Sequence, residues 1–371
     1  MKHKLARVAA WCCFAVALAP VIPAQAEEPQ GRFYGMLRSR DLTPFGFLRL
    51  DMRPAHAVSI EPRTFAFEAE LGYQNTWALS ENVEKYLTEL EASGRRDIGP
   101  AEIDALRALP GENYLLDLES ATLDLTMHYK ISSNWTFYAI ATAVSYQGGF
   151  LDSTIEGFHD LAGLSTFGRP AVTRNGTHMI YDLKGAQVVL FEPPKSPGFL
   201  DPTFGLRFTG ISLPGRWQMS VETAVKAALS GERPLLSTGH TDYGVQTSVR
   251  RLGERNALHM DFAAVYYAGQ EMPSEHDAQV IPTIVIGWER TMSARTNMNL
   301  QAYASKSVYH RAQTDLDELL SDKFQLSLGV RHRFDCCVAS FAITENLQNF
   351  NNTPDIGFQM GFAWVPRIRP Q

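Results

Sequence analysis

The chain has 371 residues, a formal net charge of −6 at pH 7, and 45% hydrophobic against 20% charged residues. This length permits one large domain or two modest ones, and the acidic balance argues against a nucleic-acid-binding protein, which would present a basic surface. The one long apolar stretch lies at the very N-terminus. The sequence therefore excludes a helical membrane protein, in which each span needs about 20 apolar residues.

That N-terminal stretch, residues 1–26, has the pattern of an export signal. It begins with three basic residues, continues with a mostly apolar run over 8–22, and ends in the small-x-small motif Ala24-Gln25-Ala26. We expect cleavage after this motif and export of the remaining chain. A single membrane anchor is the alternative.

Residues 27–62 are rich in Arg and Pro and show no strand pattern. We expect a separate N-terminal segment here. It either lies in the periplasm or folds into the domain that follows, which spans 63–371. The sequence leaves these two placements open.

From residue 63 onward, apolar and polar residues alternate in twelve segments. Phe65, Phe67 and Leu71, for example, alternate with Glu68 and Glu70. A period of two over about ten residues between turns is typical of strands in an outer-membrane β-barrel. The expected strands are Phe65–Tyr73, Ala121–Lys130, Trp135–Tyr146, Pro202–Ser212, Trp217–Lys226, Thr241–Arg250, Ala257–Tyr267, Val280–Arg290, Asn297–Ser305, Phe324–Arg331, Val338–Asn346 and Ile356–Trp364.

The links between these strands alternate in length. Short ones such as 131–134 and 251–256 alternate with long ones such as 78–113 and 147–201. Short periplasmic turns opposite long external loops are what an outer-membrane barrel shows. The sequence therefore predicts an all-β fold, a transmembrane antiparallel β-barrel of about twelve strands.

Three details of this barrel follow from local patterns. Helices are expected in the external loops at 81–92, 100–108 and 151–164. The apolar positions change phase near Ser120–Ala121, which predicts a β-bulge there. A barrel hairpin over 178–191 would raise the count to fourteen strands, but the prolines that follow it favour a loop and twelve.

Charged side chains at inward-facing positions are the candidate functional residues, because a charge facing lipid at the midplane costs about 2–4 kcal/mol. They line either a water-filled, mildly acidic conduit or a salt-bridge network that fills the barrel. These lumen residues, with an expected role in selectivity, are Glu68, Glu70, Asp117, Glu119, Asp124, Glu222, Arg250, Asp261 and Arg331. Outward aromatic residues near strand ends are expected to form interfacial girdles; they are Tyr73, Tyr138, Tyr146, Trp217, Tyr267, Trp288 and Trp364.

An enzyme is the rival interpretation from another class, because some outer-membrane barrels hydrolyse lipids. His159 and His259 are the candidate bases, but no Gly-x-Ser-x-Gly elbow accompanies them. Glu156 and His159 are too few ligands for a metal site. The sequence therefore predicts no catalytic residues, no metal site and no cofactor.

Three motifs resemble a proteobacterial family of exported proteins that is catalogued as a domain of unknown function. They are the loop Gly148-Gly149-Phe150-Leu151-Asp152 with its continuation over 155–170, the acidic segment 114–119, and the start motif Arg38-Ser39-Arg40-Asp41-Leu42-Thr43-Pro44. The start motif departs from the Arg-Asn-x-x-Pro form of that family. The resemblance implies an exported β-barrel without an assigned activity, and it supplies no catalytic residues.

The leading interpretation is a narrow passive channel or solute-binding barrel in the outer membrane, which is not an enzyme. The alternatives are a structural barrel with a charge-filled lumen and, less favoured, a lipid-active hydrolase. The loop after the third strand is expected to constrict the mouth, through Gly149, Phe150, Asp152, Glu156, Phe158 and His159. Expected partners are outer-membrane lipid and small solutes, with no nucleic acid; the oligomeric state is open.

Overall fold

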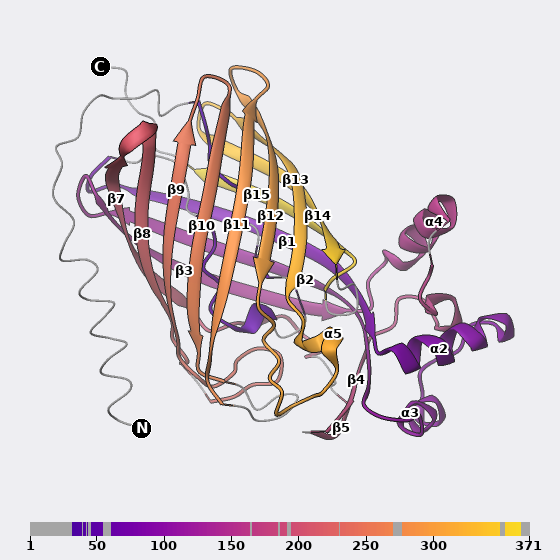
Figure 1. Cartoon of the computed structure of the whole chain (residues 1–371). Helices are drawn as coiled ribbons and strands as arrows, with labels where there is room; N and C mark the ends of the chain where they lie inside the picture. The colour runs from indigo at the N-terminus through magenta and orange to yellow at the C-terminus, as the bar shows by residue number, and fades with distance from the viewer. Residues whose placement is uncertain are drawn as a thin grey trace.

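The computed structural model describes residues 32–38, 40–41, 43, 46–54, 61–163, 165–184, 186–190, 194–229, 231–269, 277–348 and 353–364. Within these residues the strands form one sheet. Its first strand, β1 (Phe65–Leu79), pairs antiparallel with β2 (Asn113–Lys130) on one side and with the last strand, β15 (Ile356–Trp364), on the other. The sheet therefore closes into a barrel (Figure 1). The expected export signal lies outside the described residues.

Twelve of the described strands form the closed wall, as predicted. Two of them, β8 and β15, begin and end at the residues that the sequence indicated. Besides β1, β2 and β15, the wall strands are β3 (Trp135–Gln147), β7 (Thr203–Leu213), β8 (Trp217–Lys226), β9 (Asp242–Leu252), β10 (Asn256–Tyr267), β11 (Gln279–Thr291), β12 (Thr296–Ser305), β13 (Lys323–Arg333) and β14 (Cys337–Gln348).

The fourteen-strand alternative is wrong. The strands β4 (His178–Leu183) and β5 (Ala186–Leu190) form a hairpin that pairs with Asn113–Asp117 of β2, beyond the residues of β2 that pair with β3. This hairpin extends the sheet beyond the ring, at the end that carries the helices, and is not part of the closed wall. The short β6 (Gly198–Phe199) pairs with β3.

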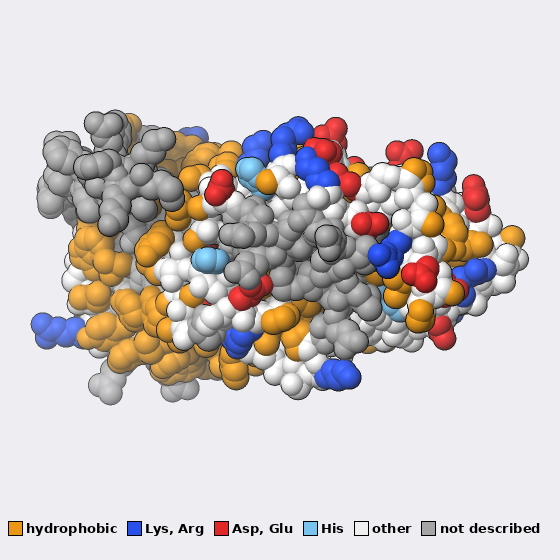
Figure 2. Space-filling view, turned by 90° about the horizontal axis from the view of Figure 1, so that it is seen from below, with side chains coloured by type: hydrophobic (Ala, Val, Ile, Leu, Met, Phe, Trp, Pro, Cys, Tyr) orange, Lys and Arg blue, Asp and Glu red, His pale blue; other side chains and the backbone are white. Residues whose placement is uncertain are grey.

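The outward positions of the wall are apolar. Phe67, Leu125, Phe262, Ile286 and Met360 are among the large hydrophobic side chains exposed there. Figure 2 shows hydrophobic side chains gathered over the barrel, on the left of the view, and charged ones spread over the part on the right. Such a belt buries its apolar surface in lipid, so the chain is an outer-membrane β-barrel.

The three longest helices lie in loops on one side of the barrel (Figure 1). The three expected helices are present as α2 (Glu81–Leu90), continued by the 3-10 turn η2 (Glu91–Ser93), α3 (Pro100–Arg107) and α4 (Asp152–Ala162). Pro100 starts α3, where its missing N–H costs nothing, and Gly163 ends α4 in the left-handed region at φ 67°. Shorter helical turns are η1 (Gly46–Leu48), η3 (Arg169–Ala171), η4 (Pro214–Arg216) and α5 (Asp317–Leu320).

No helix in the described part of the chain is long and apolar enough to cross a bilayer.

The predicted bulge at Ser120–Ala121 is wrong. The pairing of β2 with β1 keeps one register from Phe65↔Tyr129 to Leu79↔Leu115. The change of apolar phase has another cause. Residues 113–120 of β2, which lie at the end that carries the external loops and are here called its upper half, are covered on both faces and are all buried. Leu116 and Leu118 pack into a core at the external end of the barrel, where an apolar inner face is favourable.

Three of the aromatic residues expected in the outer girdles point inward instead. Tyr138, Tyr146 and Tyr267 are buried at 3%, 8% and 0% exposure. The Tyr138 hydroxyl donates to Glu222 at 2.6 Å and the Tyr146 hydroxyl to the carbonyl of Leu235 at 2.7 Å. A phenol suits such positions because its hydroxyl needs a partner when it is buried.

Candidate functional site

The candidate site is the lumen of the barrel, and the N-terminal segment occupies it. Wherever residues 32–54 are described, most of their side chains are buried, and they contact inward-facing residues of strands around the ring. Figure 1 shows this segment, in indigo, running inside the wall. We call residues 32–54 the lumen segment.

The first part of the lumen segment is held by its backbone. The amides of Tyr34 and Gly35 donate to the Glu289 carboxylate at 2.7 and 3.1 Å. Arg331 donates to the carbonyl of Met36 at 3.0 Å, and His259 contacts the same Glu289 at 3.0 Å. Arg331, which was expected in the lumen, therefore binds the backbone of the lumen segment directly. His259 reaches the segment through Glu289.

Arginines from the middle and the end of the lumen segment form ion pairs with β1 and β2. Arg40 and Arg53 both reach Asp124, at 3.2 and 2.8 Å, and Arg53 also lies 4.0 Å from Glu70. Arg38 pairs with Glu68 at 3.3 Å. Each carboxylate here faces the lumen, as the parity of the strands predicted.

Asp41 and Arg49 of the lumen segment form a second charged cluster with Lys323 of β13. Asp41 accepts from the Thr43 amide at 2.9 Å and lies 3.3 Å from Arg49 and 3.9 Å from Lys323 of β13. Arg49 also donates to the hydroxyl of Tyr303 at 2.8 Å. Because a buried charge is costly without a partner, these pairs fix the position of the segment across the barrel.

Three more of the predicted lumen residues also face inward. Glu222 is buried against Arg207 and Tyr138, Arg250 donates to Gln218 at 2.8 Å, and Asp261 is 3% exposed. Charges of both signs therefore line the described wall, in addition to those that the lumen segment brings.

Asp117 and Glu119 do not face the lumen, contrary to the prediction. With no bulge in β2, they share the outward parity of Leu123 and Leu125. Glu119 accepts from the amides of Phe150 and Leu151 at 3.1 and 2.7 Å and therefore holds the loop that leads into α4.

The loop expected to constrict the mouth lies against the outer face of this extended sheet. Gly149 has φ +75°, and a Cβ there would overlap the Glu119 side chain. Phe150 stacks on Tyr73 with ring centroids 5.2 Å apart, and Asp152 pairs with Arg169 at 2.6 Å. These contacts place the loop beside the wall. Its expected constriction of the mouth stays a prediction.

Two polar residues of α4 bind neighbouring loops. Glu156 accepts from Arg95 at 2.7 Å and from Arg174 at 2.9 Å, and His159 Nδ1 lies 2.6 Å from the carbonyl oxygen of Ser165. Burial acts to raise the pKa of Glu156, but the hydrogen bonds from Arg174 and Arg95 outweigh it and lower the pKa. Phe158, by contrast, is 61% exposed.

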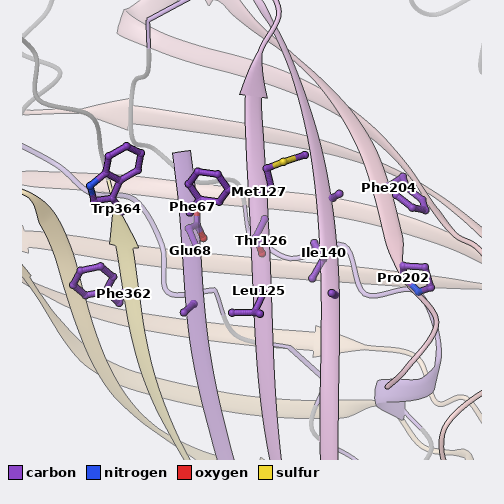
Figure 3. Close-up of a pocket in the computed structure, with 13 residues that line it drawn as sticks. Phe67, Glu68, Leu125, Thr126, Met127, Ile140, Pro202, Phe204, Phe362 and Trp364 are labelled. Carbon is purple, nitrogen blue, oxygen red and sulfur yellow. The ribbon is translucent and has the colours of Figure 1, made fainter. Parts of the chain in front are cut away.

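A hollow of about 560 Å³ lies on the outer surface of the wall across β15, β1, β2, β3 and β7. Figure 3 shows the large side chains at its rim, among them Phe67, Phe204 and Trp364. The small outward residues Ala69 and Ala141 leave the space between them. Because it opens on the apolar belt, this hollow suits a lipid chain and is no part of the lumen.

The sequence model of one protein family matches residues 109–364, which is more than half of the chain. This family, DUF3187, is described as a protein of unknown function. The chain belongs to DUF3187. The resemblance drawn from its motifs is thereby confirmed. No curated protein matches this DUF3187 chain.

Solved structures resemble this DUF3187 member at low sequence identity. An outer-membrane channel from Pseudomonas putida F1 is 9% identical, with a TM-score of 0.50, over 83% of this chain and 97% of that one. The NanC porin is 6% identical, with a TM-score of 0.41, over 81% and 100%. The toluene transporter TodX of P. putida is 11% identical, with a TM-score of 0.38, over 82% and 91%.

Sequence reasoning missed several residues that organise the DUF3187 lumen. Glu289 and Lys323 are buried on inward positions of β11 and β13. Their parity could have identified them, because each stands in phase with the polar residues of its strand. The partners of Arg40 and Arg53 had no sequence signal, since a segment without periodicity does not reveal which wall residues it meets.

Proposed function

We propose that the protein is a passive outer-membrane channel for small solutes, narrowed by the lumen segment. The observation that carries this proposal is that strands around the described ring bear buried charged side chains on their inward faces, apart from the apolar core at the external end. A core that served stability alone would be expected to be apolar, since buried ion pairs add little to stability compared with packed hydrophobic residues. The shared fold with an outer-membrane channel agrees with this choice.

The proposed path runs alongside the lumen segment, between its surface and the wall. Glu68, Glu70 and Asp124 are neutralised by arginines of that segment, so their effect on permeating ions is small while the segment is in place. Without it, these carboxylates face water. We therefore expect the full barrel to discriminate weakly between ions and the emptied barrel to prefer cations.

Single-channel conductance in a planar bilayer tests the proposal. The protein from residue 27 onward is compared with a variant that lacks Glu27–Pro62, after both show the heat-dependent gel shift of a folded barrel. We expect small, steady conductance from the first and larger, cation-selective conductance from the second. Silence from both would contradict the channel.

A matched pair of variants tests the role of the arginines without a deletion. Arg40→Gln with Arg53→Gln removes two buried partners of Asp124. Arg311→Gln removes a cation whose side chain is 73% exposed. The double variant is expected to raise conductance and the Arg311 variant to leave it unchanged.

A structural barrel with a charge-filled lumen is the second candidate function. It is favoured by the same buried ion pairs, because they connect the lumen segment to the wall at three places. On this alternative, neither the full chain nor the truncated one conducts, and the truncated one is far less stable.

The hydrolase interpretation gains no support from the described residues. His259 contacts Glu289, which holds the backbone of Tyr34, and His159 contacts the carbonyl oxygen of Ser165. Both imidazoles have structural partners in place of a nucleophile.

Export through a cleaved signal is part of the proposal. Cleavage after Ala26 would leave Glu27 as the first residue, only a few residues before the lumen segment. Mass spectrometry of the protein purified from outer membranes is expected to show a chain that begins at Glu27. A chain that still carries residues 1–26 would indicate an anchor.

A further inference from the structure

The helix α4 is fixed beside the barrel at the level where the lipid belt ends. Outward residues of β1 are apolar up to Leu71, and Tyr73 follows as the next outward side chain. Phe150 stacks on Tyr73, and Asn75, the next outward residue, donates to Asp152 in the first turn of α4 at 3.3 Å. Figure 1 shows α4 on the right of the view, beyond the end of the wall strands β1 and β2.

One face of α4 packs against the protein and another is left uncovered. Ile155 and Glu156 are buried, together with Leu151 just before the helix. Phe158 and Leu161 are 61% and 89% exposed. They stand three residues apart in the helix, so they lie on one face.

The lipid-facing belt continues up to the loop that leads into α4. From Leu71 it passes to Tyr73 and to Phe150, which stacks on Tyr73 and is 64% exposed. The helix α4 begins two residues later and adds the exposed side chains of Phe158 and Leu161. Exposed aromatic and large apolar residues on a short helix beside the hydrocarbon boundary suit insertion at the interface. The helix α4 carries acidic residues and no Lys or Arg, so its docking would rest on the burial of apolar side chains and not on attraction to anionic lipid.

From this continuity we propose that α4 docks onto the outer leaflet of the membrane, with Phe158 and Leu161 inserted among the lipids beside the barrel. The glycines at 148 and 149 let the chain turn out of β3, and Glu119 holds that turn by accepting the amides of Phe150 and Leu151. The loop thereby anchors the external helices to the membrane surface, whether or not the barrel conducts.

Fluorescence quenching by spin-labelled lipid tests this docking. A fluorophore sensitive to its environment, NBD, is attached to Leu161→Cys, and in a second sample to Ser153→Cys, an exposed polar position of the same helix. Both changes are made in the protein from residue 27 onward, which lacks Cys12 and Cys13, with Cys336→Ser and Cys337→Ser, so that one thiol reacts. The folded proteins are reconstituted in phosphatidylcholine vesicles that contain lipid with a nitroxide near the headgroup or near the end of the acyl chain.

The expected result is blue-shifted emission at Leu161 in vesicles, with quenching severalfold stronger than at Ser153 and stronger from the nitroxide near the headgroup. Equal quenching at both positions, or emission at Leu161 that stays as in water, would overturn the proposal. A blue shift that lipid nitroxides do not quench, and that grows with the ratio of protein to lipid, would also overturn it, because a second copy would then cover α4. Replacing Phe158 by Ser in the Leu161→Cys protein is expected to weaken the quenching while the gel shift of the folded barrel remains.

Discussion

The two halves of β2 reverse the relation between polarity and face. In the lower half, Leu123 and Leu125 point outward into lipid while Asp124 and His128 point inward. In the upper half, Asp117 and Glu119 point outward while Leu116 and Leu118 point inward. The strand stays regular throughout, because its register with β1 does not shift.

The difference shows that a strand's pattern records what covers each face and not which face is inside. Around Asp124 the inner cover is the Arg-rich lumen segment and the outer cover is lipid. Around Glu119 the outer cover is a loop that offers backbone amides, and the inner cover is an apolar core. The same strand therefore serves a lumen in one half and a helical extension in the other.

The largest effect is expected from Asp124→Asn in the lower half. This change removes the carboxylate that Arg40 and Arg53 share, so two buried guanidinium groups lose the negative charge of Asp124. Breaking a buried ion pair costs about 3–5 kcal/mol. Urea unfolding of the folded barrel, followed by gel shift, measures the loss.

Two controls sharpen this result. Asp335→Asn breaks an ion pair in which the Asp335 side chain is 78% exposed, and it should cost less than about 1 kcal/mol. In the chain without Glu27–Pro62, Asp124→Asn should no longer destabilise, because its arginine partners are gone. An equal loss with and without the segment would show that the pairing is not the cause.

A smaller effect is expected from Glu119→Gln in the upper half. The amides of Phe150 and Leu151 lose a charged acceptor, which costs about 1–3 kcal/mol locally. Hydrogen exchange over 148–162 should become faster, whereas Glu89→Gln, on the exposed side of α2, should leave it unchanged. Conductance should not respond to Glu119→Gln. A change as large as that from Arg40→Gln with Arg53→Gln would place Glu119 in the lumen.

The smallest effect concerns pH and the helical extension. The pKa of Glu156 lies below its ordinary value of 4.5, because the hydrogen bonds from Arg174 and Arg95 outweigh the effect of burial. A lowered carboxyl pKa means that the ionised form favours the folded state. Its contribution is therefore present above pH 4.5 and is lost as the pH falls through the lower folded value. Hydrogen exchange of α4 between pH 7 and pH 3 should show this loss, and Glu156→Gln should remove the dependence.

The closed wall could be predicted because lipid imposes one rule on every strand. Outward residues such as Phe262 and Leu328 must be apolar, so the period of two survives even where the inward residues vary. Helices such as α3 were also predictable, since Pro100 marks its start. The reversed half of β2 was not, because its covers come from distant loops that no local pattern describes.

The candidate site was predictable on one side only. Inward carboxylates such as Glu68 and Asp124 follow from parity, but their partners come from residues 32–54, which have no period. Asp117 and Glu119 were placed in the lumen because charge was assumed to face inward throughout. That assumption fails above the membrane, where an outward charge meets protein and not lipid.

The lumen segment also has a consequence for the order of assembly. It precedes every wall strand in the sequence, and its contacts reach β1 through Glu68 and β13 through Arg331, on the two sides of the seam where β15 meets β1. The first and last wall strands come together only at that seam. A segment bound to both sides before closure acts as a template around which the sheet curls, so its loss is expected to slow barrel closure even where the finished wall is unchanged.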